Sequence, residues 1–159
     1  LYVDELHPKT SGGAVLTPAR PSILLDFDNG SSAGYEEIGN GSVLPYRNKV
    51  QGVGIANDSS AFSITIPVSG LYQLSVAVLT DAAEGIELAV TVNGTASSNI
   101  ILRNYTDNTR SNTMNVAYEF SANDVLKIIN NTGGSRGFYR GYMPSDTGRY
   151  SYWSMYFIG

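Results

Sequence analysis

The side chains that most often carry out catalysis are scarce in this chain. It has no cysteine and a single histidine, His7, which lies beside Pro8 in a turn-rich leading segment. A Ser-His-Asp or Cys-His constellation needs an imidazole next to its nucleophile, so neither can be built here. Glu36 and Glu37 are adjacent, and because neighbours on an extended chain point apart, they do not form a glycosidase pair. We therefore expect no enzymatic activity.

Two short acidic stretches share some features with metal sites. The run Asp26–Gly30 is rich in oxygen ligands, but its spacing is shorter than that of a calcium loop, and no bidentate Glu follows at the required distance. Asp81 and Glu84 lie in an Asp-Ala-Ala-Glu-Gly turn and form an equally weak pair. Without cysteine, a Cys-ligated zinc site is excluded. We expect neither a metal nor a cofactor.

Arginine and tyrosine gather in two polar segments, and these residues suit surface recognition. Arg forks bind carboxylates or phosphates, while tyrosine rings stack on sugar faces and hydrogen-bond at the rim of a site. Both segments, 130–150 and 104–112, are interpreted as loops because they are rich in Gly or Asn. The candidate ligand-binding residues are Arg136, Tyr139, Arg140, Tyr142, Arg149 and Tyr150 in the first segment and Tyr105, Asn108 and Arg110 in the second.

Each of these segments has a structural alternative. In the first, Phe138, Tyr139 and Tyr142 pack beneath the loop or meet at a threefold axis. For the second segment, 104–112, the alternative is a solvated turn that binds no ligand.

Composition and alternation predict a framework of β-strands for these segments. Charged residues make up 15% of the chain, and Gly (17) and Tyr (11) are abundant, which is a composition poor in helix formers. Alternating or β-branched runs bounded by turn residues predict strands, and Asn93-Gly94 is a strong hairpin signal. The predicted strands are 22–25, 61–66, 71–79, 86–92, 98–102, 116–120, 125–129 and 151–158. With no convincing helix, the predicted fold is all-β: an antiparallel jelly-roll β-sandwich.

One domain with a short extension accounts for the length of the chain. Residues 1–21, which contain Pro8, Pro18 and Pro21, are predicted to form an extended leader or shaft connection, and residues 22–159 the head domain. Because the chain begins at Leu1 rather than Met, we expect an upstream part. No apolar run approaches the roughly 20 residues of a membrane helix, so membrane insertion is not expected. The net charge of −4, scattered along the chain, argues against nucleic-acid binding.

The last predicted strand indicates a subunit interface. One of its faces carries Trp153, Met155 and Phe157, and the other carries the alternate residues. One core cannot bury both faces, so the second aromatic face needs another cover, either a neighbouring subunit or a loop. The candidate trimer-interface residues are Tyr152, Tyr156 and Ile158.

Four segments, in order along the chain, resemble complement-q/tumour-necrosis-factor jelly rolls. Ala61–Leu74 resembles the Phe…Pro-Val-x-Gly-x-Tyr-x-Phe signature of that family, and Val90–Gly94 resembles its strand ending in Asn-Gly. Phe120–Leu126 resembles the Gly-Asp-x-Val turn, and Tyr152–Ile158 the closing Phe-x-Gly-x-Leu strand. The resemblance covers about residues 21–159. Two positions depart from these signatures and bear on how a trimer packs, namely Asn123 and Met155, where Gly is usual.

The leader has a second resemblance. Leu1–Thr10, followed by Ala19–Ser22, is similar to the segment before the globular tip of bacteriophage tail-fibre proteins. Together the resemblances imply a non-enzymatic, homotrimeric head that binds a glycan or protein of the host surface. They place it on the virion surface, or outside the cell if the chain is not viral. The alternatives are a trimerisation or virion-decoration module without a ligand, and a monomeric carbohydrate-binding module.

Overall fold

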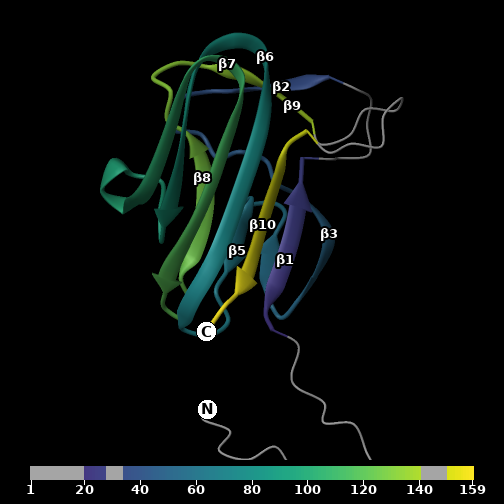
Figure 1. Cartoon of the computed structure of the whole chain (residues 1–159), viewed down its shortest axis with the longest axis vertical. Coiled ribbons are helices and arrows are strands. Elements are labelled where there is room, and N and C mark those ends of the chain that lie inside the picture. Colours follow the sequence, from purple (N-terminus) through teal and green to yellow (C-terminus); the bar gives the residue numbers. More distant parts are fainter. Residues whose placement is uncertain (1–19, 28–33, 141–149) are drawn as a thin grey trace, which may run out of the picture.

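The structure of this chain, a computed structural model, describes residues 20–27, 34–140 and 150–159 (Figure 1). These residues form strands and one short 3₁₀ turn, η1 (Ser97–Asn99). The strands are β1 (Ser22–Asp26), β2 (Tyr35–Ile38), β3 (Asn48–Val53), β4 (Ala56–Asp58), β5 (Ser63–Thr65), β6 (Gly70–Val92), β7 (Ile100–Phe120), β8 (Val125–Asn130), β9 (Arg136–Tyr139) and β10 (Tyr152–Phe157).

The strands build two antiparallel layers that face each other across the core (Figure 1). The front layer has the order β3-β1-β10-β6-β7, in which Gly70–Leu79 of β6 pairs with Ser111–Phe120 of β7. The back layer has the order β4-β5-β8-β6-β7, in which Ile86–Thr91 of β6 pairs with Ile100–Thr106 of β7. Both long strands therefore belong to both layers, which gives the jelly-roll architecture predicted from the sequence.

The core lies between the layers, and the strand alternation places it there. In the front layer Leu25, Trp153 and Val76 stand in one row across three strands, and all three are buried. In the back layer Val90 and Ile128 stand opposite each other and are buried as well. Successive side chains of a strand point to opposite faces, so each strand gives one set of apolar residues to this core.

Side chains close the corner where β6 and β7 leave one layer for the other. Between Leu79 and Glu84 the register shifts, and several residues of β6 stand against a single residue of β7. The buried Asn112 donates its amide to the carbonyls of Ile86 (2.9 Å) and Asn104 (3.1 Å), and its Oδ1 accepts from Asn104 Nδ2 (2.6 Å). The Thr80 hydroxyl lies between carbonyls on both sides of the corner, 2.9 Å from that of residue 82 and 3.2 Å from that of residue 110, and its one hydrogen is shared between them. These bonds satisfy backbone groups that the bulge withdraws from the ladder.

Most of the predicted strands are confirmed. The structure has strands at 22–26, 63–65, 125–130 and 152–157, and the predicted strands 71–79 and 86–92 both lie within β6. The sequence did not indicate β2, β3 or β4. Their residues are largely polar and exposed, so they lack the alternation that marks a half-buried strand.

Three interpretations of loops and turns were wrong. Residues 104–112 lie inside β7, and the Asp81–Gly85 turn lies inside β6. β9 occupies part of the predicted loop 130–150. In each case backbone pairing forms the strand while polar side chains face solvent, and Asn108, at φ 48°, keeps the left-handed conformation that Asn tolerates.

The connection at Asn93-Gly94 is also longer than a two-residue hairpin. Residues 93–99, including η1, separate the two strands, and β7 begins at Ile100. Asn93 has φ 56°, and its side chain bonds Asp124 Oδ1 (3.0 Å) and the amide of Val125 (2.9 Å). The local turn conformation was anticipated, but these tertiary bonds tie it to the next turn of the chain.

The substitution Asn112→Ala tests how much the side-chain hydrogen bonds of the β6–β7 corner stabilise the fold. Removing the amide leaves the carbonyls of Ile86 and Asn104 without their donor in a buried site, so we expect the free energy of unfolding to fall by about 2–3 kcal/mol. Urea unfolding at one protomer concentration measures it. Asn57→Ala is the control, because no hydrogen bond joins the Asn57 side chain to another residue of the described ranges. Equal losses in the two variants would show that the corner has no special role.

Candidate functional site

The two ends of the sandwich differ in structure (Figure 1). At the lower end of the view, the Arg20 guanidinium donates to the carbonyl of Ile158 (2.7 Å), and the amide of Leu71 donates to the carbonyl of Gly159 (2.7 Å). The opposite end carries the β6 corner and a two-stranded ribbon of β2 and β9, which joins the corner through the pair Thr80 and Phe138. We call this end the apical surface and define it by β2, β9 and residues 80–87 and 103–110.

The apical surface brings together residues from the two segments that the sequence singled out. Arg136 on β9 donates its Nε to the carbonyl of Gly85 (3.3 Å). A Cβ at Gly85 would lie 2.6 Å from the hydroxyl of Tyr105, so the absence of a side chain there lets the phenol cross β6. Tyr105, 58% exposed, and Arg136 thus meet over one residue of the β6 corner, although they are far apart in sequence.

Ion pairs surround this meeting point. Arg136 Nε lies 3.2 Å from Glu84 Oε2, and Arg103 lies 3.6 Å from Glu87 Oε1, which also accepts from Asn131 Nδ2 (2.6 Å). Glu84, Glu87 and Arg103 were not among the predicted site residues. Single charged residues in strands carry no spacing signal, and only the pairing of β6 with β7 and β9 places them here.

Tyr105 has its own acidic neighbour. Its hydroxyl donates to Asp107 Oδ1 (3.3 Å). The negative charge of Asp107 disfavours the phenolate and raises the pKa of Tyr105 above the ordinary tyrosine value, an effect that Arg136 partly opposes. The carboxylate of Asp107 therefore already accepts a hydrogen bond from the neighbouring Tyr105 hydroxyl.

Three tyrosines line the outer face of the β2–β9 ribbon. The rings of Tyr35 and Tyr139 stand 6.5 Å apart at 75°, and those of Tyr139 and Tyr150 stand 6.4 Å apart at 51°. Tyr35 is 52% exposed and was not among the candidate residues that the sequence indicated. Phe138 points the other way and is fully buried, as the structural alternative for this segment proposed.

The remaining candidates have simpler environments. Asn108 and Arg110 are exposed near the bend of β7. Arg140 is half-buried, and its backbone amide donates to the carbonyl of Gly34 (3.1 Å). Tyr142 and Arg149 lie outside the described residues.

The acidic residues that the sequence singled out have separate environments, and residues 28–30 of the first acidic stretch lie outside the described ranges. Glu36 forms a two-pronged pair with Arg47 (2.9 and 3.1 Å), whereas Glu37 is exposed on the other face of the ribbon, so the two carboxylates point apart as expected. Asp26 accepts from Asn48 Nδ2 (3.0 Å). Within residues 20–27, 34–140 and 150–159 no three His, Cys, Asp or Glu side chains are placed to hold a metal ion. The same ranges contain no helix long and apolar enough to span a membrane.

A second candidate surface is the central part of the outward face of the front layer, which we call the neutral face. The next row of this outward face, toward the lower end, contains Leu71 and the exposed carboxylate of Glu119. The predicted alternation of the last strand is confirmed, because Trp153 and Met155 are buried whereas Tyr156 is 52% exposed. The neutral face consists of three rows from β3 to β7: Val53, Ser22, Tyr156, Gln73 and Ala117; Gln51, Leu24, Ser154, Ser75 and Asn115; and Asn48, Asp26, Tyr152, Ala77 and Thr113.

Only one residue of the neutral face carries charge, and that residue, Asp26, is buried. Tyr152 is half-buried beside it, and Ile158 is half-buried at the end of the strand, where its amide donates to the carbonyl of Leu71 (2.8 Å). The neutral face therefore spans five strands, exposes no charge and includes two tyrosine rings.

Behind this face, burial raises the pKa of the core residue Tyr46 well above its ordinary value, and Tyr152 adds to this rise.

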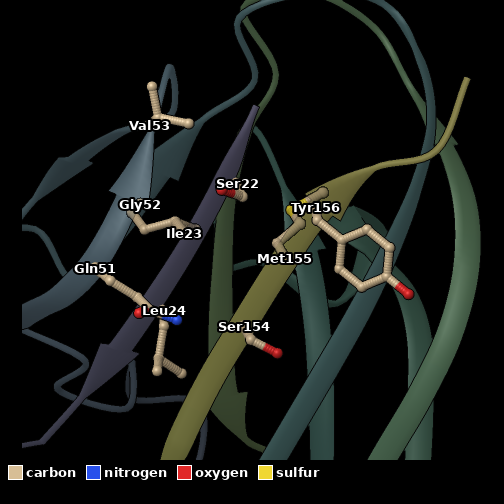
Figure 2. Close-up of a pocket in the computed structure, with 9 residues that line it drawn as sticks. All are labelled: Ser22, Ile23, Leu24, Gln51, Gly52, Val53, Ser154, Met155 and Tyr156. Carbon is tan, nitrogen blue, oxygen red and sulfur yellow. The ribbon is translucent and has the colours of Figure 1, made fainter. Parts of the chain in front are cut away.

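A hollow of about 530 Å³ interrupts the neutral face between β3 and β10 (Figure 2). Its wall includes Leu24, Gln51, Val53 and Tyr156, whose side chains come from three neighbouring strands. A Cβ at Gly52 would stand 2.4 Å from the carbonyl oxygen of Ser22, so glycine is required for the close approach of β3 to β1.

Comparison with solved structures identifies the fold. Eiger TNF from S. frugiperda matches with a TM-score of 0.69 at 11% identity, over 89% of this chain and 94% of that one. The globular domain of zebrafish complement 1qA protein matches with 0.60 at 13% identity (88% and 98%), and murine APRIL with 0.61 at 12% (88% and 100%). The chain therefore has the TNF/complement-1q jelly-roll fold. No family model matches the chain, and no curated protein matches it by sequence.

The charge of Asp107 can be tested through Tyr105. We expect Asp107→Asn to lower the pKa of Tyr105 toward about 10, because the carboxylate that opposes the phenolate is removed. Ring ¹³C NMR across a pH series, with the signal assigned by Tyr105→Phe, follows the titration. Asp81→Asn, on the other side of the corner, is the control and leaves the Tyr105 curve in place. An unchanged curve in Asp107→Asn contradicts the arrangement described here.

Proposed function

We propose that this chain is the non-enzymatic head of a homotrimer that presents its apical surface to a receptor outside the cell. The single observation that carries the proposal is the neutral face. Across three rows and five strands it exposes no charge, and it combines small polar side chains with the exposed ring of Tyr156. A sheet face of this kind, with an exposed tyrosine and a hollow, suits contact with another protein surface.

The exposed edge of β7 supports self-assembly as the form of that contact. Ser111–Phe120 is the last strand of the front layer and pairs only with β6 among the described residues. It contains no Lys, Arg or Pro, and Glu119, near its end, is its one charged residue, so little protects this edge from pairing with other chains. In a cyclic trimer every contact joins two different surfaces, so the β7 edge of one copy can pack on the neutral face of the next. The jelly-roll fold supports three as the number of copies.

The polarity of the domain supports receptor binding at the apical surface. The described residues at the start and end of the chain lie at one end, and the tyrosines and ion pairs gather at the other. A head joined to a shaft through residues 1–21 would hold its apical surface outermost. Exposed tyrosines and arginines are the residues that recognition surfaces favour. The resemblance of the leader to phage tail fibres suggests a virion surface and a host glycan or protein as receptor.

The absence of enzymatic activity belongs to the same proposal. The single histidine of the chain, His7, is in the leader, and the apical carboxylates of Glu84 and Glu87 are held in ion pairs. Both carboxylates are therefore occupied by neighbouring arginines.

The oligomeric state is the first test. Light scattering at low micromolar concentration should give three chain masses for the native protein. Tyr156→Ala removes an exposed ring from the neutral face, and Ser154→Asp adds a charge to it. Each should raise the dissociation constant of the trimer at least about tenfold, while the circular dichroism of the protomer stays unchanged.

Tyr105→Ala is the matched control for assembly, because Tyr105 is about as exposed as Tyr156 but lies outside the neutral face. It should leave the mass of the trimer unaltered. A native protein that runs as a clean monomer would overturn the trimer and favour a monomeric carbohydrate-binding module. A trimer that Ser154→Asp does not weaken would place the interface elsewhere.

A further inference from the structure

The outer face of the β2–β9 ribbon combines aromatic walls with carboxylates. Tyr35 stands directly opposite Tyr139, and Glu37 directly opposite Gly137, so the side chains of Tyr35, Tyr139 and Glu37 emerge on the same face. The partly exposed ring of Tyr150 extends the row beyond Tyr139. The residues of the other ribbon face include Phe138 and Ile38, which are buried in the core.

Gly137 brings a further carboxylate into this row. The point at which a Cβ of Gly137 would stand lies 2.7 Å from the Asp81 carboxylate (Cγ and Oδ2) and 2.7 Å from Cδ2 of Tyr35. The carboxylate and the ring edge are therefore no more than twice that distance apart, and both lie against the glycine. Any larger residue at position 137 would push them apart. The β6 corner supplies Asp81, the ribbon supplies Tyr35, and Gly137 allows them to meet.

Neither of the two carboxylates near Gly137, those of Asp81 and Glu37, is paired with another side chain in the part of the chain that the structure describes. Among the residues that the structure describes, no hydrogen bond or ion pair joins Asp81 or Glu37 to another group. Every other carboxylate described above is engaged: Glu36 by Arg47, Glu84 by Arg136 and Glu87 by Arg103. Asp81 is also half-buried, so it is partly withdrawn from water without a compensating contact. Its acceptor oxygens are available to a ligand.

The surrounding rings favour a positively charged ligand. The faces of tyrosine rings carry partial negative charge and attract an ammonium group within about 6 Å of the centroid. The rings of Tyr35 and Tyr139 meet at 75° and so present faces in two directions, unlike the flat platform on which a neutral sugar ring stacks. Two unpaired carboxylates add a negative potential at the same place. The ring faces and the carboxylates both attract a cation, and both repel an anion.

We propose that Tyr35, Tyr139 and Asp81 form a binding site for an organic ammonium group, with Glu37 as a more distant counter-charge. The ammonium lies against the ring faces and donates to, or pairs with, the Asp81 carboxylate. This inference rests on the proposed function, because it names the chemical class that the apical surface recognises: a surface component bearing a primary or quaternary amine.

A matched pair of residues on the same apical surface serves as an internal control. Tyr105 and Asp107 are also a tyrosine and a carboxylate on the apical surface, and Tyr105 is even more exposed than Tyr35. There, however, the phenol hydroxyl donates to the carboxylate (3.3 Å), and two arginines, Arg103 and Arg136, lie among the neighbouring ion pairs. The proposal therefore predicts ammonium binding at Asp81 and not at Asp107.

The test titrates the full chain, with ¹³C-labelled tyrosine rings, with choline and with its neutral carbon isostere 3,3-dimethyl-1-butanol. Glucosamine against glucose gives the same comparison for a primary amine. We expect the amine of at least one pair to shift the Tyr35 and Tyr139 signals, and its neutral partner to bind at least about fivefold more weakly, since only a charged group gains from the ring faces. Which pair responds separates a quaternary from a primary ammonium.

Variants locate the site. Asp81→Asn and Tyr35→Leu should each weaken amine binding at least about fivefold, because one removes the counter-charge and the other the ring while keeping apolar bulk. Asp107→Asn and Tyr105→Leu should leave it unchanged. Equal binding of amine and neutral isostere, no binding of either amine, or an equal loss in Asp107→Asn each overturns the proposal.

Light scattering on the same samples separates this result from the assembly proposal. If the protein is a trimer and binds neither choline nor glucosamine, the proposed ligand class is wrong and the trimer proposal is unaffected. A monomer that binds choline or glucosamine through Asp81 overturns the trimer and leaves the ammonium site standing.

Discussion

The structure depends on the passage of two long strands, β6 and β7, through both layers of the sandwich. A strand that changes layers must break its ladder at the corner, and backbone groups that lose partners in a buried place are costly. Side-chain hydrogen bonds that span the corner offset this loss, and they come from Asn112, Asn104 and Thr80. Because the corner is held in this way, the two layers face each other and enclose one core.

The same corner creates the apical surface. The residues that β6 adds between its two halves bulge outward and pack along β9, which places Asp81 beside Tyr35 and Gly85 beneath Tyr105. Two glycines, Gly85 and Gly137, let aromatic rings lie against backbone where any side chain would exclude them. A feature required by the fold therefore also positions the exposed tyrosines and the carboxylates near them.

Charge is distributed unevenly over the molecule. Arg136 and Arg103 pair with Glu84 and Glu87 on the apical surface, whereas the neutral face holds a single carboxylate that is buried. A sheet face without exposed charge suits contact with another protein surface, because no charged side chain has to lose its water when the face is covered. The proposed assembly surface and the proposed ligand site thus lie on different parts of one domain.

The fold tolerates very different sequences, as its likeness to Eiger TNF at 11% identity shows. What such chains share is the alternation of apolar residues and the order of strands, because the core selects for size and polarity more than for particular residues. This explains why short signatures such as Ala61–Leu74 and Tyr152–Ile158 sufficed to indicate the jelly roll. The resemblance to the fold is confirmed, whereas the homotrimer and the phage setting remain proposals.

The sequence by itself determined the fold class, the strands with a buried face and the faces of the last strand, because period-two alternation is a local signal. It could not determine β2, β3, β9 and the middle of β7, which are short or largely polar and are strands because a partner completes their ladder. Nor could it show that Tyr105 meets Arg136, or that Asp81 meets Tyr35. Those contacts join residues remote along the chain through strand register and through glycines whose missing side chains only the packed structure makes significant.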